Sequence, residues 1–316
     1  MGAGRLRRAH VAVALAFVAF GTVDGTWVAR LPALKQPLGL DSGELGLVIF
    51  SVSLAETVLL PVSGWLTSRR GIRGPTALGL LVTASALTAA AFAPSLHSLV
   101  ASACLLGAGF SIVDVAANAH GVAVEQRLGR PVLSALHGAW SFGLLAGSGI
   151  AAGAAATGVG VRAQFPAVSI GVVVAAIVLV PRLLPSAEDA ALDTAHFALP
   201  RGALALPALL TFCSMFVESA AMNWSAVFLS GPAHASAAVG AGCAALVPAL
   251  FRVAAAAPGV SSGAGIAAVA TAGYTGGVVN GPAIGFLARG VGLTAALSLV
   301  GVAGLLIAVL GPRLRS

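Results

Sequence analysis

Long apolar stretches, about ten of them, alternate with short polar turns along the whole chain. Each stretch is long enough to cross a hydrocarbon layer of about 30 Å as a helix, because a helix rises about 1.5 Å per residue. Open sheet edges are not tolerated in lipid, so all of the stretches are expected to be helices. We place the expected spans at residues 9–29, 44–66, 74–94, 96–119, 132–156, 163–184, 205–229, 236–256, 264–286 and 290–311.

Composition places the chain among membrane proteins. It is 58% hydrophobic and only 9% charged, and a soluble fold cannot hide so much apolar surface from water. Its 40 glycines suit transmembrane helices that pack closely through small residues. The predicted fold class is therefore all-α, a polytopic bundle of about ten transmembrane helices. The net charge of +7 is spread over short turns, which excludes a nucleic-acid surface and indicates membrane topology.

The first apolar stretch follows Arg5, Arg7 and Arg8, as the core of a signal peptide would. It continues past Asp24 to Trp27 without a small-residue cleavage site, and many more spans follow it. We therefore interpret it as the first transmembrane helix.

The distribution of basic residues predicts the orientation. With the N-terminus inside, thirteen arginines fall in cytoplasmic segments, and the outer loops hold only Arg30, Lys35, Arg162 and Arg289. Cytoplasmic loops carry the excess of basic residues, so both termini are predicted to lie in the cytoplasm, with the chain in the plasma (inner) membrane. Residues 185–203 are the longest link and are expected to be a cytoplasmic connector. They divide a six-helix half, residues 1–184, from residues 204–316, a second half of about four helices.

The two halves carry matching residues. An offset of 134 residues relates Trp140, Gly143, Gly147 and Ile150 to Tyr274, Gly277, Gly281 and Ile284. An offset of 197 relates Trp27-Val28-Ala29 to Trp224-Ser225-Ala226. The offsets differ by 197 − 134 = 63 residues, about two spanning helices with their loops, so the loss is placed between Trp224 and Gly240. The alternative is that these are chance matches in a chain rich in glycine and alanine.

The turn after the second span reads GWLTSRRGIR. Four further motifs are TWVARLP in the first span, VDVAANA in the fourth, LGRPVLSALHGAWSFG entering the fifth and ESAAMNWSAVFL in the seventh. Together they resemble the major facilitator superfamily, and more specifically the bacterial permeases near the fucose–proton symporters. That family has twelve helices in a six-plus-six plan, so its helices eight and nine have no counterpart here. The resemblance implies a gating loop that includes Gly64, Arg69, Gly71 and Arg73, with Ser68 at the position of the family's aspartate.

Four acids fall well inside the expected spans, at least five residues from either end: Asp24, Glu56, Asp114 and Glu218. A charge near the middle of a bilayer costs roughly 2.5–3.5 kcal/mol or more, so each acid should face a cavity or a partner. The resemblance implies that the helices of Asp24 and Asp114 line the central cavity. We therefore expect Asp114 to carry the proton, and Asp24 to bind the substrate or a second proton. An equally weighted alternative is that either aspartate only forms a hydrogen bond to a neighbouring helix.

The other polar and aromatic residues inside the spans have both a functional and a structural interpretation. Glu218 lies within two turns of Trp224, where a structural bond is slightly favoured, and Glu56 is expected to be structural or gating. Asn118 lies one turn beyond Asp114, and the pair suits a polyhydroxylated or zwitterionic solute. Trp140 and Tyr274 correspond across the repeat and offer flat faces for a sugar ring; the alternative is anchoring at the membrane interface.

No nucleotide-binding GxxxxGK[ST] motif and no HExxH motif is present, and no enzyme activity is predicted. The three cysteines show no metal-binding spacing, and neither a metal nor a cofactor is expected. The leading prediction is a secondary transporter that couples proton flow to the uptake of a small polar solute, such as a sugar, by alternating access. Its partners would be the solute, protons and the lipid bilayer, with no nucleic acid. It would be a monomer, or two copies covering the missing helices. The alternatives are a degenerate protein that transports nothing, and an efflux permease for small apolar compounds.

Overall fold

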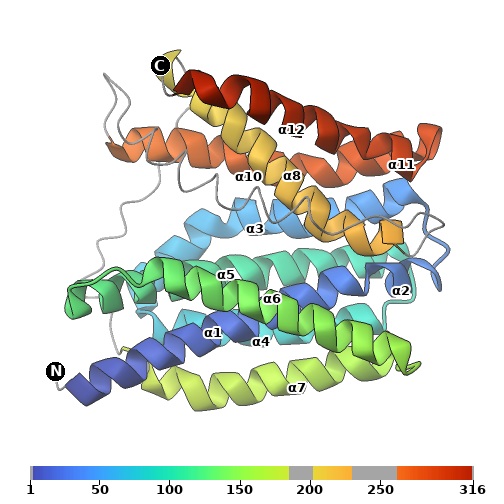
Figure 1. Ribbon diagram of the computed structural model, residues 1–316. Helices are drawn as coiled ribbons and strands as arrows, with labels where there is room; N and C mark the ends of the chain where they lie inside the picture. The colour runs from blue at the N-terminus through green and yellow to red at the C-terminus, as the bar shows by residue number, and fades with distance from the viewer. Residues whose placement is uncertain (1–2, 185–201, 230–261, 315–316) are drawn as a thin grey trace. The chain divides into compact units, whose positions relative to one another are not determined.

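The computed structural model describes residues 3–184, 202–229 and 262–314, which form helices and connecting turns without a strand (Figure 1). Eight of the described helices are long and apolar enough to cross a membrane. The α-helices are α1 (Ala3–Ala29), α2 (Leu31–Lys35), α3 (Ser42–Arg70), α4 (Arg73–Ala91), α5 (Leu96–Leu128), α6 (Leu133–Ala156), α7 (Val161–Leu179), α8 (Ala205–Leu229), α10 (Ser262–Val291), α11 (Leu293–Ala296) and α12 (Ser298–Leu310). Three short 3-10 helices are η1 (Val180–Arg182), η2 (Gly202–Leu204) and η4 (Gly311–Leu314).

The all-helical prediction is confirmed, with three differences in the details. The short helix α2 lies in the link between the first two spans, where no helix was expected. Helix α5 runs nine residues beyond the expected 119, because it continues out of the apolar stretch. It ends at Gly129, whose φ of 65° is favoured by glycine and whose N–H donates to the Glu125 carbonyl at 2.9 Å. The last expected span divides into α11 and α12. The expected span 236–256 lies outside the described residues.

The helices group into two compact units. The first is Met1–Leu38 with Leu54–Leu192, and the second is Gly39–Ser53 with Asp193–Ser316. Helix α3 therefore contributes its first residues to the second unit and the rest of its length to the first. Six of the eight candidate spans, α1 and α3 to α7, lie wholly or mainly in the first unit.

Within the first unit, α1 packs against α6 without intervening side chains. Gly21 and Gly25 of α1 face α6, and a Cβ added to either would run into a backbone carbonyl of Trp140 or Leu144. Gly143 and Gly147 of α6 meet the carbonyls of α1 in the same way. Such small-xxx-small pairs let helix backbones approach closely in lipid, where packing replaces the hydrophobic effect as the driving force.

Hydroxyl groups tie the same helices together. The Thr26 hydroxyl donates to the Gly147 carbonyl at 3.4 Å, and the Ser148 hydroxyl donates to the Gly25 carbonyl at 3.2 Å. Elsewhere in the unit, the Thr88 hydroxyl donates to that of Ser169 at 2.9 Å, joining α4 to α7. These bonds between helices fix the rotation of each helix about its axis.

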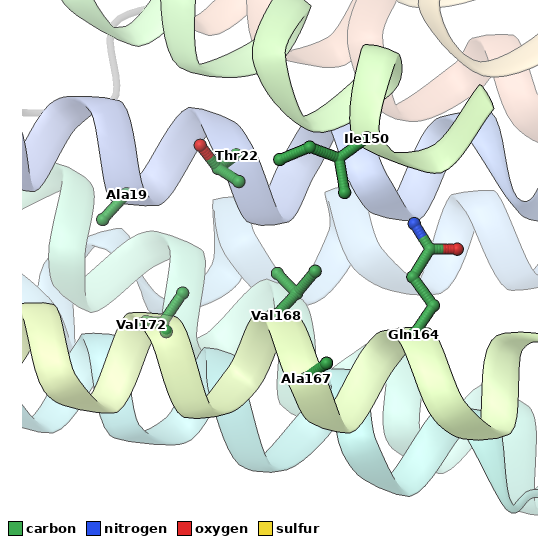
Figure 2. Close-up of a pocket in the computed structure, with 8 residues that line it drawn as sticks. Ala19, Thr22, Ile150, Gln164, Ala167, Val168 and Val172 are labelled. Carbon is green, nitrogen blue, oxygen red and sulfur yellow. The ribbon is translucent and has the colours of Figure 1, made fainter. Parts of the chain in front are cut away.

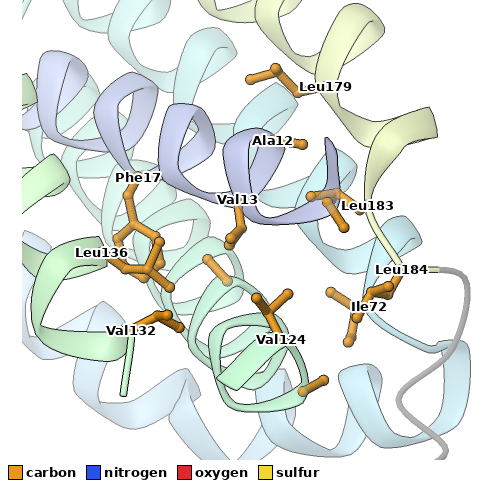
Figure 3. Packing of buried hydrophobic residues seen from close by; sticks show 13 residues of the cluster. Ala12, Val13, Phe17, Ile72, Val124, Val132, Leu136, Leu179, Leu183 and Leu184 are labelled. Carbon is orange, nitrogen blue, oxygen red and sulfur yellow. The ribbon is translucent and has the colours of Figure 1, made fainter. Parts of the chain in front are cut away.

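Near the start of α1 lies a cluster of buried apolar side chains (Figure 3). Phe17 and Val13 of α1 pack with Leu136 of α6 and Val124 of α5. Leu183, just beyond η1, completes the cluster. The end of the six-helix segment is thereby held against its beginning.

In the second unit, α10 packs on α8 and on the first residues of α3. A Cβ at Gly276 would meet the carbonyl of Phe212, and Gly46 of α3 faces the backbone of Gly281 and Gly285. The start of α3 is closed by a capping box, in which the N–H of Glu44 donates to the Asp41 carboxylate at 2.8 Å and the N–H of Asp41 donates to the Glu44 carboxylate at 2.8 Å.

Candidate functional site

Helices α1 and α5 each carry a phenylalanine followed one turn later by an aspartate. The rings of Phe20 and Phe110 meet edge to face, with centroids 5.1 Å apart. Successive spans alternate in direction, so α1 and α5, the first and fourth, run antiparallel (Figure 1). Asp24 and Asp114 therefore lie on opposite sides of the aromatic pair along the helix axes, each displaced by one turn, roughly 6 Å.

Glu56 of α3 is the third acid of this region. Its carboxyl interacts electrostatically with those of both Asp114 and Asp24. All three side chains are partly buried. Within the described residues neither Asp24 nor Glu56 makes a hydrogen bond, so both carboxyls remain available to a ligand or to a proton.

Asp114 is the acid that has protein partners. The Asn118 amide donates to its carboxylate at 2.8 Å and to its backbone carbonyl at 3.0 Å. His137 of α6 interacts electrostatically with the same carboxyl, and its ring packs against Phe17 at 5.6 Å. Asn118 is half-buried and His137 is exposed, so both can meet a bound molecule.

Trp140 of α6 extends the aromatic surface. Its ring lies 6.4 Å from that of Phe20, and its buried indole N–H has no acceptor among the described residues. A buried N–H without a partner costs free energy, so a ligand oxygen at this point would be favoured. The surface formed by Asp24, Glu56, Asp114, Asn118, His137, Trp140, Phe20 and Phe110 is called the acidic face below.

The other candidates lie in the second unit. Glu218 of α8 is half-buried and has no hydrogen bond from a described residue. Tyr274 of α10 is 42% exposed. The structure thus brings Asp24, Asp114, Asn118 and Trp140 together in the first unit, and it holds Glu218 and Tyr274 in the second.

Two residues of the acidic face are not predicted as ligands from the sequence. The sequence predicts a structural or gating role for Glu56, and His137 is not among the expected site residues. The spacing that could have indicated this surface is the shared Phe-x-x-x-Asp pattern, Phe20 to Asp24 and Phe110 to Asp114.

The expected gating residues lie near the end of α3, in the turn that follows it and at the start of α4. Gly71 has a φ of 71°, a left-handed conformation that favours glycine in this tight turn. Arg73 donates through Nε to the Leu183 carbonyl at 2.8 Å and through a terminal nitrogen to the Pro181 carbonyl at 3.0 Å. Arg69 lies over the Trp65 ring at 5.8 Å, and Gly64 lies inside α3. Arg73 therefore ties this loop to the end of the sixth span.

The acidic face can hold protons and can offer both donors and acceptors to a solute. Three carboxyl groups supply acceptors when ionised and donors when protonated, while the Trp140 N–H supplies a donor and the Asn118 amide oxygen supplies a further acceptor. No group of three possible metal ligands occurs within residues 3–184, 202–229 and 262–314. The chemistry offered by these side chains is reversible binding.

Comparison with known sequences identifies relatives. A family model for the Major Facilitator Superfamily matches residues 12–240. An uncharacterized MFS-type transporter of Yersinia pestis is 28% identical over 228 residues, covering 70% of this chain and 57% of that protein. An uncharacterized transporter of Sinorhizobium fredii is 30% identical over 224 residues, covering 69% of this chain and 58% of that protein. The match thus spans little more than half the length of these two relatives. Membrane protein MosC of Rhizobium meliloti is 24% identical over 359 aligned positions, covering 94% of this chain and 88% of MosC.

Solved structures show the same fold. The nucleoside transporter NupG, as its D323A mutant, superposes with a TM-score of 0.66 at 13% identity, covering 96% of this chain and 99% of that one. A bacterial homolog of the human lysosomal transporter Spinster gives a TM-score of 0.58 at 13% identity, covering 98% of this chain and 81% of that one. At these identities the likeness is one of fold alone.

Proposed function

This chain belongs to the major facilitator superfamily, a family of multi-pass membrane transporters and not of enzymes, and from that premise we propose that it takes up a small polar solute by coupling its movement to protons. The two helical halves would expose a site near the middle of the membrane to each side in turn. The plasma membrane, with both termini in the cytoplasm, is the proposed location.

The observation that carries this proposal is the set of three partly buried carboxyls on α1, α3 and α5, in which Glu56 interacts electrostatically with both aspartates. Asp24 and Glu56 make no hydrogen bond within the described residues. Acids in a membrane span are costly and are retained where they carry ions or bind substrates. Asp114 is proposed as the main proton site, with Asp24 as substrate ligand or second proton site. Glu56 joins them because it interacts with both.

The solute class follows from the partners of Asp114. The Asn118 N–H groups already donate to Asp114, so the Asp114 carboxylate and the Asn118 amide oxygen offer neighbouring acceptors, which suits vicinal hydroxyl groups. The nearby Trp140 offers a flat apolar face. We therefore propose a sugar as the solute, in keeping with the resemblance to fucose–proton symporters.

We also propose that the second half lacks two helices, lost between Trp224 and Gly240, of which residues 230–240 lie outside the described residues. The alignment with MosC supports this loss. It covers 94% of 316 residues, about 297, yet runs over 359 positions, so roughly 62 positions of MosC have no counterpart here. That number is close to the 63 residues expected from the internal repeat.

The test is uptake of radiolabelled L-fucose and a panel of other sugars into proteoliposomes under an imposed inward proton gradient. The parent protein is expected to accumulate one solute above equilibrium. Asp114→Asn should lower gradient-driven accumulation at least tenfold while counterflow exchange without a gradient persists, because binding remains and proton coupling is lost. Asp24→Asn should lower both.

Glu125→Gln is the matched control for removing a carboxylate. Glu125 accepts from the N–H groups of Val132 and Leu133 at 2.7 and 3.1 Å, and the amide oxygen of glutamine can accept both bonds. Accumulation by Asp114→Asn at the parent's rate and with the parent's pH dependence would remove Asp114 as the proton carrier. Absence of any flux in the parent would favour a non-transporting protein, and outward flux of apolar dyes would favour an efflux permease.

A further inference from the structure

The first unit contains a cavity that is separate from the acidic face. Its volume is about 410 Å³, which falls in the range of small-molecule pockets. Figure 2 shows it bounded by Thr22 of α1, Ile150 of α6, and Gln164 and Val168 of α7. Ala19, Ala167, Gly171 and Val172 complete a lining that is almost wholly apolar.

Gln164 is the polar exception, and it lacks partners. Its side chain points from α7 toward α1 (Figure 2). The residue is 4% exposed, and neither its Oε1 nor its Nε2 has a hydrogen-bond partner among the described residues. The Thr22 hydroxyl already donates to the Val18 carbonyl at 2.8 Å. A buried amide without partners costs roughly 1–3 kcal/mol, so a ligand with a carbonyl oxygen at this point would recover that free energy.

The residues that line the cavity on all three helices lie in the same half of the membrane. Gln164 follows the start of α7 by three residues and Val172 follows it by eleven, which at about 1.5 Å per residue puts them roughly 4.5 and 16.5 Å from that end. Ile150 lies six residues before the end of α6 and Thr22 seven before the end of α1, roughly 9 and 10.5 Å from the same membrane surface. The cavity therefore reaches from just beneath one surface to about the middle of a 30 Å hydrocarbon layer.

The cavity opens on a surface that faces lipid. Ile150 is 51% exposed, and on α7 the neighbouring Ile170 and Ile177 are 65% and 70% exposed. Lipid acyl chains are the natural cover for such side chains in a membrane helix. The occupant must thus be apolar along about one leaflet and must carry an acceptor near the membrane surface.

We propose that this cavity binds one acyl chain of a phospholipid, with the ester carbonyl accepting a hydrogen bond from the Gln164 amide. The chain would lie along Val168 and Val172 toward the middle of the bilayer. The ester group of a phospholipid lies at the boundary of the hydrocarbon layer, the depth at which Gln164 is found. The bound lipid would be a structural ligand of the first unit, independent of the solute and protons of the acidic face.

The test uses nanodiscs that contain a trace of phosphatidylcholine with a photoreactive diazirine in the middle of one acyl chain. After irradiation, mass spectrometry measures labelling of Ile150, Val168 and Val172 relative to labelling of Ile170 and Ile177. Gly171 lines the cavity, and a Cβ there meets no atom within 4 Å, so Gly171→Phe should fill the space and lower the ratio at least fivefold. Gln164→Leu should lower it at least threefold.

Gly301→Phe is the matched control, because Gly301 is exposed on α12 and a Cβ added there also meets open space. The labelling ratio of this variant should equal that of the parent. A diether analogue of the probe lacks the ester carbonyl. Its labelling ratio in the parent should be no higher than the ratio that the diester probe gives in Gln164→Leu. Equal ratios in the parent, Gly171→Phe and Gln164→Leu would overturn the proposal. Equal labelling by the diester and diether probes would overturn the role of Gln164.

Discussion

Single polar side chains in the spans fall into two kinds, those that bond to the backbone and those that do not. The hydroxyls of Thr22, Ser51, Thr67 and Ser102 each donate to the carbonyl four residues earlier, at 2.7 to 2.9 Å. These residues are satisfied within their own helices and need no further explanation. Asp24 and Glu56 have no hydrogen bond among the described residues, which distinguishes these two candidate ligands from the four hydroxyl residues.

Arg73 is expected to be the most important arginine of the loop after α3. Arg73→Ala removes bonds to the Leu183 and Pro181 carbonyls and should cost about 1–3 kcal/mol of stability. Thermal unfolding of the purified protein in detergent measures this as a fall in Tm. Arg70→Ala is the control, because Arg70 is exposed and makes no bond within the described residues. Equal effects of the two substitutions would contradict the role given to Arg73.

At the scale of helices, glycine decides how closely neighbours approach. The pairs Gly21–Gly25 and Gly143–Gly147 bring the backbones of α1 and α6 into contact. The spacing of small residues was visible in the sequence, but the partner helix was not, because any small-xxx-small pair can pack on any other. The structure supplies that pairing.

Gly143→Val should separate α1 from α6, because the added Cβ would overlap the carbonyl of Val18. We expect the free energy of unfolding to fall by about 1–3 kcal/mol or more, which is measured as a fall in Tm. Gly149→Val is the control in the same helix, since a Cβ there meets no atom within 4 Å. A Tm for Gly143→Val at or above that of the control would show that this contact does not limit stability.

The ion pair between Asp41 and Arg289 joins the start of α3 to the end of α10 at 2.8 Å. The hydrogen bond from Arg289, followed by that from the Glu44 backbone, lowers the pKa of Asp41. A lowered pKa in the folded state gives stability that is fully present above the unfolded value, about 3.9, and is lost as the pH falls through the lowered value. Both side chains are largely exposed, 40% and 51%, so the pair contributes less than about 1 kcal/mol.

Arg289→Gln should therefore lower Tm by the same small amount between pH 8 and pH 5, and the difference from the parent should shrink below about pH 4. Arg162→Gln, which changes an exposed arginine without a partner among the described residues, is the control. A difference that grows as the pH falls would contradict this assignment.

For the whole molecule, the sequence predicted the fold class, since apolar stretches and composition were sufficient for an all-helical membrane protein. It also identified Asp24, Asp114 and Asn118 as polar residues inside spans. It could not bring Glu56 to the same surface, because the rotation of α3 about its axis depends on contacts such as the 3.0 Å bond between the Ser63 and Ser111 hydroxyls. The cavity around Gln164 was likewise invisible, since it depends on three helices failing to fill the space between them.

The orientation of the first unit can be tested with a membrane-impermeant maleimide. Gln36→Cys, in the exposed turn after α2, should react in intact cells. Arg130→Cys, in the turn between α5 and α6, should react only after the membrane is opened. Background labelling of the parent, which has three cysteines, is subtracted. The reverse pattern would invert the orientation predicted from the arginines.

Helix α2 ends at Lys35, the single lysine in the 316-residue sequence. Reagents that acylate amines consequently have one side-chain target, and the α-amino group, with a pKa near 8, can be distinguished from it by choice of pH. A fluorophore or a surface tether can therefore be attached at this turn without altering a residue. Single-molecule measurements of the unmodified sequence thereby become practicable.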